Sequence, residues 1–513
     1  MRILYVPLDE RPCNAVYPIK AAKVARDVEV ISLPAEEMGY KKNAADTNRI
    51  WQFIQKEIAR TDYLIISVEM LLYGGLLPSR LHHLTLADLK EYESNLRTLK
   101  KNYPEKKLFL SNLIMRTPKY NSSDEEPDYY EVYGERIFRF GWLSDKANRE
   151  NLMESEQQEL EALQKELPQE VISDYETRRH FNVNANLTNI QLVKEGIIDF
   201  LSIPQDDSAP YGYTAIDQKK VYGTIQELGL KGKVMVYPGA DEVGFTLLAR
   251  AYNDWRNTQP TLFVRYASTL GPTLVPLYED RIINESLKAH VMAAGMRLID
   301  NESEADFILA YNVPGKKMQE SWDQFKNKDV TYDSYRHLLT FVDQIERALQ
   351  KGKKVGICDS AFANGGDLEL LQMLDQKNLI EQLICYKAWN TNCNSLGSTL
   401  SALTFAQNEV DEKAMMDNLI SNIFEDGFYQ AAIRMDLTKT LLPSLGLNYF
   451  DLKTEEAKVM EQIHQKMMTM AEIYLPNSFS NQSLEIQKLS SPWNRMFEIY
   501  CDVRVFQKKE RKK

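Results

Sequence analysis

The chain has 513 residues and a formal net charge of −11, with 62 Lys and Arg against 73 Asp and Glu. This acidic balance disfavours nucleic acid and anionic membranes as partners, because phosphate binding needs a basic surface. Hydrophobic residues make up 44% of the chain and charged residues 26%, which is typical of globular rather than disordered proteins. The length exceeds what one ordinary core supports, so we expect two or three domains.

The N-terminal segment is read as a first strand rather than as a signal peptide, because its apolar run is short and charge arrives by Asp9. No stretch approaches the roughly 18 apolar residues that span a bilayer. The five cysteines are odd in number and contain no CxxC pair, which indicates neither a disulfide framework nor a thiolate zinc site. Together these patterns predict a cytoplasmic protein.

Short apolar runs alternate with longer helical patterns, which predicts an α/β fold with largely parallel sheets. The first series of predicted strands covers residues 3–7, 28–33, 63–68, 107–112, 200–203 and 234–237. A second series follows the polar stretch 254–260 and covers residues 261–266, 307–311, 354–358 and 383–386. Segments 47–60 and 334–349 between strands carry apolar residues at the spacing of amphipathic helices.

Three regions are predicted from these patterns. Residues 1–257 form an N-terminal α/β domain, either an irregular (β/α) barrel of the TIM-barrel kind or a doubly wound sheet, and periodicity does not choose between them. Within it, the highly charged segment 146–180 predicts a helical excursion. Residues 258–410 form a smaller Rossmann-like or flavodoxin-like domain. Residues 411–513 are predicted to be helical, because no strand pattern stands out there.

Carboxylates follow most strands of the first series. Active sites of parallel α/β folds form at the carboxyl ends of strands, so these acids are the candidate catalytic groups. The leading pair is Asp206 and Asp207, directly after a strongly apolar strand, and Asp241 with Glu242 comes second. The ordinary alternative is that such acids are turn residues and helix caps. That alternative does not explain why the acids recur in adjacent pairs, since one cap needs only one carboxylate.

Adjacent acids support two chemistries. Repulsion and partial burial raise one pKa, so one acid donates a proton while its neighbour stays ionised. The same pair can instead bind a hard cation such as Mg²⁺ or Mn²⁺ through its oxygens. We predict no organic cofactor and leave a divalent metal open.

Further residues near these strand ends are predicted to bind substrate. Tyr211 is placed to stack on a sugar face or to donate a hydrogen bond, and Arg11 or Arg116 to bind a substrate carboxylate or to neutralise the acids. For Arg11 the structural alternative is an ion pair with its own neighbours. The remaining members of this set are Asp9, Glu10, Asn14, Glu69 and Arg80.

The second series adds Asp359 and Asn364, followed by Gly365 and Gly366, after one strand, and Trp389 and Asn390 after another. Two adjacent glycines permit close backbone approach, and Trp389 with the asparagines is a suitable surface for a polyol. A capping loop is the alternative for 390–394. The segments do not match the glycine patterns of nucleotide sites, so none is inferred.

Other common chemistries lack their sequence patterns. The six histidines form no HExxH or HxH pattern, which argues against zinc. No GxSxG elbow is present. Cys13 and Cys358 lie near strand ends and are interpreted as buried structural thiols in preference to nucleophiles.

Four segments together carry a resemblance to a known family: PLDERPCN at 7–14, YGGLLPSR at 73–80, IPQDD at 203–207 and WNT at 389–391. The chain resembles, over nearly its whole length, the bacterial domain-of-unknown-function family numbered 4127. This resemblance implies no particular activity. Asp206 and Asp207 also resemble the vicinal acids of substrate-assisted hexosaminidases, an analogy that rests on two residues.

Our first hypothesis is a carbohydrate-active hydrolase that cleaves a glycosidic bond of a small-molecule or oligosaccharide substrate by carboxylate acid/base chemistry. The second is a metal-dependent isomerase or lyase acting on a sugar or sugar acid. The third is a non-enzymatic, two-lobed sugar-binding protein. The substrate, the stereochemical course and the number of subunits stay open.

Overall fold

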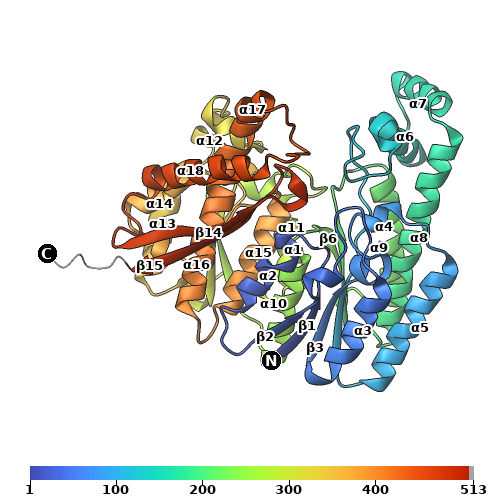
Figure 1. Cartoon of the computed structure of the whole chain (residues 1–513), viewed down its shortest axis with the longest axis horizontal. Coiled ribbons are helices and arrows are strands. Elements are labelled where there is room, and N and C mark those ends of the chain that lie inside the picture. The colour runs from blue at the N-terminus through green and yellow to red at the C-terminus, as the bar shows by residue number, and fades with distance from the viewer. Residues whose placement is uncertain (508–513) are drawn as a thin grey trace. The chain divides into compact units, whose positions relative to one another are not determined.

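The computed structural model of the chain describes residues 1–507, which divide into two compact units (Figure 1). Unit 1 comprises residues 1–10, 29–247 and 278–280. Unit 2 comprises residues 11–28 and 248–277 and the described chain from residue 281 onward. Both are built on parallel sheets, so the predicted α/β class is confirmed. Within residues 1–507, none of the helices combines the length and the hydropathy that a membrane crossing requires.

Unit 1 contains a six-stranded sheet in the order β2-β1-β3-β4-β5-β6, in which every neighbouring pair is parallel. The two edge strands are not paired with each other in the described chain, so this sheet is open rather than a closed barrel. Its strands are β1 (Arg2–Val6), β2 (Glu29–Ser32), β3 (Tyr63–Ser67), β4 (Lys107–Ser111), β5 (Phe200–Gln205) and β6 (Val234–Pro238).

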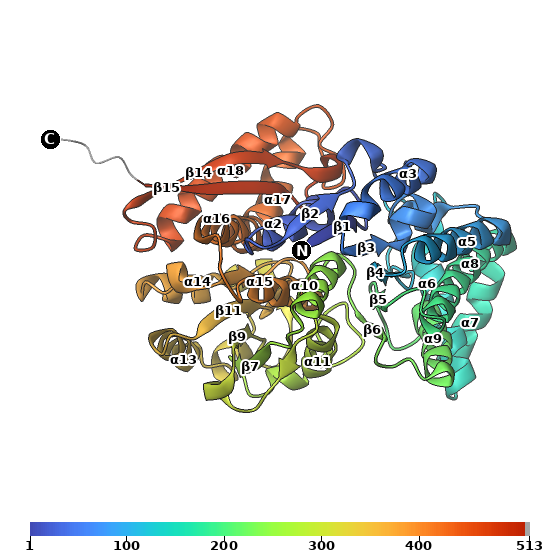
Figure 2. The ribbon, with the colours of Figure 1, turned by 90° about the horizontal axis from the view of Figure 1, so that it is seen from below.

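One face of this sheet is covered by four helices, which lie together beside the strands in Figure 2. Alternate strand residues such as Leu4, Ile66 and Leu110 pack against them and are buried. Every second side chain of a strand points to this face of the sheet, where it packs against apolar side chains of the helices. The covering helices are α3 (Thr47–Glu57), α5 (Leu86–Asn102), α8 (Gln169–Lys194) and α9 (Tyr213–Leu228).

The remaining helices of unit 1 are shorter or inserted. Between β4 and β5 the chain forms three successive helices, which include the predicted helical excursion 146–180 but begin earlier in the sequence, at Tyr130. The elements are η1 (Ala35–Glu37), η2 (Ile58–Arg60), the π-helix η3 (Glu69–Tyr73), α4 (Pro78–Leu81), α6 (Tyr130–Arg149) and α7 (Glu154–Glu166), with α10 (Val243–Arg256) continuing the chain into unit 2.

Unit 2 contains a five-stranded parallel sheet in the order β13-β11-β9-β7-β8. Counted within each unit, both sheets therefore have the order 2-1-3-4-5, to which unit 1 adds a sixth strand. The strands of the unit 2 sheet are β7 (Thr261–Tyr266), β8 (Arg297–Leu298), β9 (Phe307–Asn312), β11 (Lys354–Asp359) and β13 (Cys385–Lys387). A separate two-stranded sheet pairs β10 (Gln319–Glu320) with β12 (Phe362–Ala363).

Both faces of the unit 2 sheet are covered. Ile308 and Val355 pack with α13 (Leu338–Gln350) and α14 (Leu368–Gln376), whereas Leu309 packs with α11 (Ile283–Ala293) and α15 (Asn392–Phe405). Further helices of the unit are α1 (Pro12–Ala15), α2 (Tyr17–Ala22), η4 (Gly271–Thr273), η5 (Glu302–Glu304), η6 (Ser321–Phe325), α12 (Thr331–Ser334) and η7 (Ile380–Gln382).

The C-terminal part is helical over much of its length, as predicted, but it also contains an antiparallel hairpin that the prediction missed. The hairpin consists of β14 (Gln482–Ser490) and β15 (Tyr500–Gln507), with a register shift between Ile486 and Lys488. That shift interrupts the alternation of apolar and polar residues that marks a strand. The helices are α16 (Glu412–Asn422), the π-helix η8 (Ile423–Ile433), α17 (Arg434–Ser444), α18 (Glu456–Tyr474) and η9 (Pro492–Asn494).

Candidate functional site

The leading acid pair lies at the carboxyl end of β5. All residues of β5 are buried, whereas Asp206 and Asp207 emerge from it with side chains that are 16% and 31% exposed. Asp207 has a φ of +42°, a conformation that costs a non-glycine residue free energy. The fold therefore holds this carboxylate in a strained position at the end of the strand.

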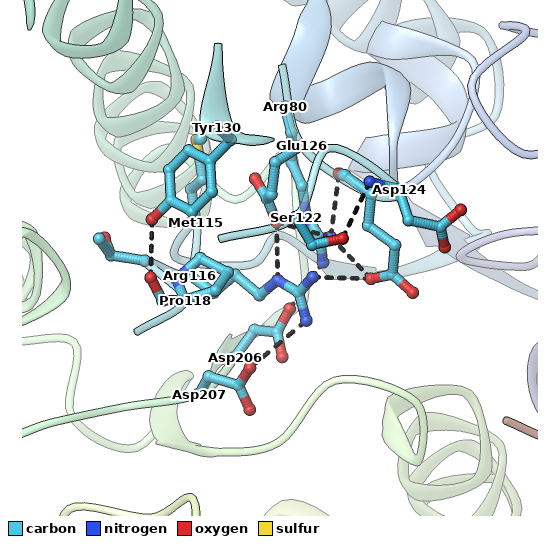
Figure 3. Close-up of polar contacts among 12 residues, drawn as sticks. Arg80, Met115, Arg116, Pro118, Ser122, Asp124, Glu126, Tyr130, Asp206 and Asp207 are labelled. Carbon is cyan, nitrogen blue, oxygen red and sulfur yellow. Dashed lines mark hydrogen bonds and ion pairs between the residues drawn. The ribbon is translucent and has the colours of Figure 1, made fainter. Parts of the chain in front are cut away.

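Two buried arginines bind the aspartates. Arg80 comes from α4 and Arg116 from the segment after β4 (Figure 3). Arg80 Nη2 donates to Asp206 Oδ2 at 2.8 Å, and Arg116 Nη1 donates to Asp207 Oδ2 at 3.3 Å. Charge-assisted bonds of this kind orient a carboxylate as well as attract it.

Two further acids, Glu125 and Glu126, bind the same arginines. Glu126 Oε1 accepts from Arg116 Nε at 2.9 Å and from Arg80 Nη1 at 3.2 Å. Glu125 Oε2 accepts from Arg116 Nη2 at 2.7 Å and from Arg80 Nη1 at 3.2 Å. Figure 3 shows Asp206 and Asp207 on one side of Arg116 and Glu126 on the other. We call these two arginines and four acids the arginine–acid cluster.

The electrostatic environment favours a proton on the aspartate pair. Burial and the neighbouring charge of Asp207 raise the pKa of Asp206 to about 6, although Arg116 and Arg80 act in the opposite direction. Burial also raises the pKa of Asp207 above its usual range, again against the two arginines. A carboxyl group with its pKa raised in this way holds its proton in mildly acidic solution, which is a property that a general acid needs.

Asp241 and Glu242 follow β6, and both are buried. The charge of Asp241 contributes to the raised pKa of Asp206, after burial and Asp207. Glu242 instead folds back on its own turn, where its Oε2 accepts from the backbone N–H of Ala240 at 2.9 Å. Asp241 is therefore the better candidate for a role beside the aspartate pair.

Glu69 lies deeper, in the π-helix η3. Its carboxylate accepts from Ser67 Oγ at 2.8 Å, from Asn112 Nδ2 at 2.9 Å and from the N–H of Leu113 at 2.8 Å, and burial raises its pKa. Glu69, Tyr73 and Asp206 line a cavity of about 10 Å³, enough for one water. The buried hydroxyl of Tyr73 has no hydrogen-bond partner in the described part of the chain.

Several predicted substrate-binding residues have other partners in the structure. Tyr211 donates to Glu150, and the Arg149 guanidinium stacks over its ring at 4.5 Å, so it is tied to the inserted helices. Glu10 Oε1 accepts from the N–H of Lys41 at 2.7 Å, and Asp9 is buried. Arg11 pairs with Glu498 at 3.2 Å and, with the buried Asn14, belongs to unit 2.

Asp359 in unit 2 is bound by three hydrogen-bond donors of its own unit. It accepts from Asn312 Nδ2 at 2.9 Å, from the Tyr386 hydroxyl at 2.7 Å and from the N–H of Asp367 at 2.7 Å. Burial, followed by the charge of Asp367, raises its pKa to about 6. It is fully buried, so we assign it to the framework of unit 2.

Asn364 and Asn390 both have positive φ angles, +59° and +58°, and the N–H of Asn364 donates to the carbonyl of Asn390 at 2.6 Å. The loops after β11 and β13 are thus joined. Trp389 is half-buried, and its indole Nε1 is buried without a hydrogen-bond partner in residues 1–507. These loops keep their predicted polar, partly accessible character.

A metal centre was the alternative use of the acids. Among the residues that the structure describes, no three His, Cys, Asp or Glu side chains are arranged to hold a metal ion. In the arginine–acid cluster, guanidinium N–H groups bind one oxygen of each carboxylate. The positive charges of Arg80 and Arg116, in direct contact with these acids, disfavour a cation there.

A family model described as "Protein of unknown function (DUF4127)" matches residues 3–502. The chain belongs to the DUF4127 family. No curated protein and no solved structure matches it.

Not all notable polar residues of this DUF4127 protein were selected from the sequence. Glu125 and Glu126 were not chosen, although they form an adjacent acid pair after a strand like those that were. In unit 2, Glu425 and Asp426 of η8 are buried, and burial raises the pKa of Asp426 to about 7. No local pattern marks these two, because they lie inside a segment that is helical in pattern.

Proposed function

We propose that the arginine–acid cluster is the catalytic site of a carbohydrate-active hydrolase that cleaves a glycosidic bond. The observation that supports this most is the pairing of Asp206 and Asp207 with Arg80 and Arg116 at a strand end, together with the raised pKa of Asp206. A carboxylic acid that keeps its proton near neutrality can protonate a leaving group. We also propose that both units are doubly wound sheets of the flavodoxin-like order.

In the proposed reaction, Asp206 gives its proton to the glycosidic oxygen as the bond from that oxygen to the anomeric carbon breaks. Asp207 remains ionised and stabilises the positive charge that develops at the sugar. Water attacks the anomeric carbon directly, or, in a substrate-assisted course, the substrate's own acetamido oxygen attacks first and water then opens the resulting oxazolinium ion at the anomeric carbon. The proton that water releases returns to Asp206, so the carboxyl group ends as it began.

Arg80 and Arg116 are positioning residues in this scheme. Each binds one aspartate and also the glutamates, so the aspartates keep their orientation through the reaction. The metal-dependent isomerase or lyase has less support, because the two guanidinium charges in contact with these acids repel a cation.

A panel of aryl glycosides tests the proposal. We expect turnover by the wild-type chain that survives a chelator and falls by about 100-fold or more in Asp206→Asn and in Asp207→Asn. Asp128→Asn, whose side chain is fully exposed, is the matched control and should keep full activity. Wild-type inactivity on the whole panel would count against the hydrolase, and sugar binding without turnover would favour the sugar-binding alternative.

A further inference from the structure

Arg434, the first residue of α17, is a buried cation to which no acid among the described residues binds. Its side chain is 2% exposed, Nη1 donates to the carbonyl of Phe497 at 3.1 Å, and Nε has no hydrogen-bond partner in residues 1–507. No Asp or Glu in that range forms an ion pair with it. Burial of an uncompensated charge is strongly unfavourable, and an anion bound to Arg434 would offset this cost.

Nearby arginines are different in this respect. Arg495 Nη2 and Arg11 Nη1 bind the two oxygens of Glu498, at 3.1 and 3.2 Å. Glu498 is therefore engaged by other guanidinium groups. Within residues 1–507, Arg434 differs from these arginines in having no carboxylate bound to its guanidinium group.

Aromatic rings flank the Arg434 guanidinium. Its central carbon lies 5.5 Å from the ring centre of Trp322 and 6.0 Å from that of Phe497. Trp389 packs edge-on against Phe497, with ring centres 6.2 Å apart. All three rings are half-buried, so part of each remains accessible beside the buried cation. Such rings offer stacking surfaces to the apolar face of a sugar.

Two buried polar atoms beside these rings also lack partners among the described residues. Gln430 lies one helical turn before Arg434, and its Nε2 donates to the carbonyl of Phe497 at 3.0 Å while its Oε1 accepts nothing. The Trp389 Nε1 has no acceptor. Unsatisfied buried groups are costly, and here an acceptor and two donors lie around one ring, that of Phe497.

The surrounding backbone holds these groups in place. Ser321, beside Trp322, donates to the carbonyl of Asn364 at 2.6 Å and reaches that of Gln430 at 3.5 Å. Gly365 approaches Ala431 so closely that an added Cβ would lie 2.6 Å from the Ala431 nitrogen. The loops after β11 and β13 and the helices η6 and η8 are thus fixed to one another, which lowers the cost of ordering a ligand site.

We propose that Arg434, Gln430 and Trp389 form a binding site for a sugar acid. The ligand carboxylate binds Arg434 and accepts from the Trp389 Nε1, a ligand hydroxyl donates to Gln430 Oε1, and the sugar ring stacks on Trp322 or Trp389. The site lies wholly within unit 2 and goes beyond the hydrolase proposal, because its test is binding and needs no turnover.

Calorimetric titration of the full chain with D-glucuronate, and with D-glucose and inorganic phosphate for comparison, tests the site. We expect glucuronate to bind at least about tenfold more tightly than glucose, since a hydrogen bond to a charged group distinguishes them. Arg434→Met should weaken glucuronate binding by about tenfold or more, and Trp389→Phe by about threefold. Arg347→Met, at a side chain that is 69% exposed, is the matched control and should bind as wild type does.

Arg434→Lys serves if the methionine variant does not fold, because it keeps the charge but loses the planar donor pair, and it should bind glucuronate less tightly than wild type. Equal affinity for glucuronate and glucose would overturn the proposal. So would tighter binding of phosphate than of glucuronate, or unchanged glucuronate affinity in both Arg434→Lys and Trp389→Phe.

Discussion

The raised pKa of Asp206 makes the free energy of unfolding depend on pH. Burial and the charge of Asp207 raise its pKa from the usual 3.8 to about 6, so the folded state holds this proton more tightly than the unfolded state does. Between about pH 4 and pH 6 the folded chain therefore carries more protons, and this group lowers the free energy of unfolding as pH rises. Above pH 6 the full loss in the free energy of unfolding is present.

From this linkage we expect Asp206→Asn to be more stable, relative to wild type, at pH 8 than at pH 4. The difference is bounded by about 1.4 kcal/mol for each unit of pKa shift. Urea denaturation at the two pH values measures it, with Asp128→Asn as the exposed control. A relative stability of Asp206→Asn that does not change with pH would contradict the raised pKa.

The positive φ of Asp207 also agrees with a functional role for the aspartate pair. A positive φ at an aspartate persists only where surrounding contacts hold it, and here Arg116 binds the carboxylate. The strand-end geometry therefore favours orientation of this side chain over the most stable backbone. This is the balance that proteins commonly show at functional sites.

At the scale of elements, the close approach of the β11–α14 loop to η8 depends on Gly365. This residue has a φ of +139°, and a Cβ there would lie 2.6 Å from the nitrogen of Ala431 and 2.8 Å from Ser321 Oγ. Gly196 also has a positive φ, +75°, but a Cβ there would meet nothing within 4 Å.

We therefore expect Gly365→Ala to destabilise the protein much more than Gly196→Ala. The conformational cost is about 1–2 kcal/mol at Gly196 and about 1–3 kcal/mol at Gly365, and overpacking adds about 1–3 kcal/mol at Gly365 alone. Urea denaturation followed by circular dichroism measures both. Equal losses in the two variants would show that packing against Ala431 is not tight.

The strands of both sheets were predictable because their apolar runs are short, buried and bounded by turn residues. The ten predicted strands are all present, with ends that differ by a few residues. The strands β8 and β10 were not predicted, because each has only two residues and so shows no alternation of apolar and polar side chains. The π-helices η3 and η8 were not predicted, since an extra residue per turn leaves the apolar spacing close to that of an α-helix.

The aspartate pair could be selected from sequence because adjacent acids after a buried strand have few structural explanations. Its arginine partners, Arg80 and Arg116, were selected because they lie in the segments that follow β3 and β4 and carry a charge that can bind a carboxylate. Arg434 could not be selected, because its position inside a helical pattern says nothing about the missing counter-charge. That property depends on Trp322, Phe497 and the absence of a nearby acid among the described residues.

At the scale of the whole molecule, each unit has its own hydrophobic core. Ile66 lies in the core of unit 1 and Val342 in a core of unit 2, and both side chains are fully buried. Truncation of a buried aliphatic side chain to alanine costs about 2–5 kcal/mol for isoleucine, because transfer and cavity terms add. The lost stability should appear first in the unit whose core is damaged.

Amide hydrogen exchange tests this. Ile66→Ala should lower protection in β1, β3 and β4 while leaving β9 and β11 protected, and Val342→Ala should do the reverse. Loss of protection in all five strands with either variant would contradict the division of the chain into two cores.

The acid catalysis proposed for unit 1 depends most on the pH at which Asp206 loses its proton. Carbon-13 NMR of the side-chain carboxyl groups, titrated from pH 3 to pH 9 and assigned with Asp206→Asn, measures this directly. We predict that the carbon of Asp206 titrates near pH 6 in the wild-type chain. Titration near its usual value of 3.8 would mean that no proton is available near neutrality, and the proposed acid catalysis would be contradicted.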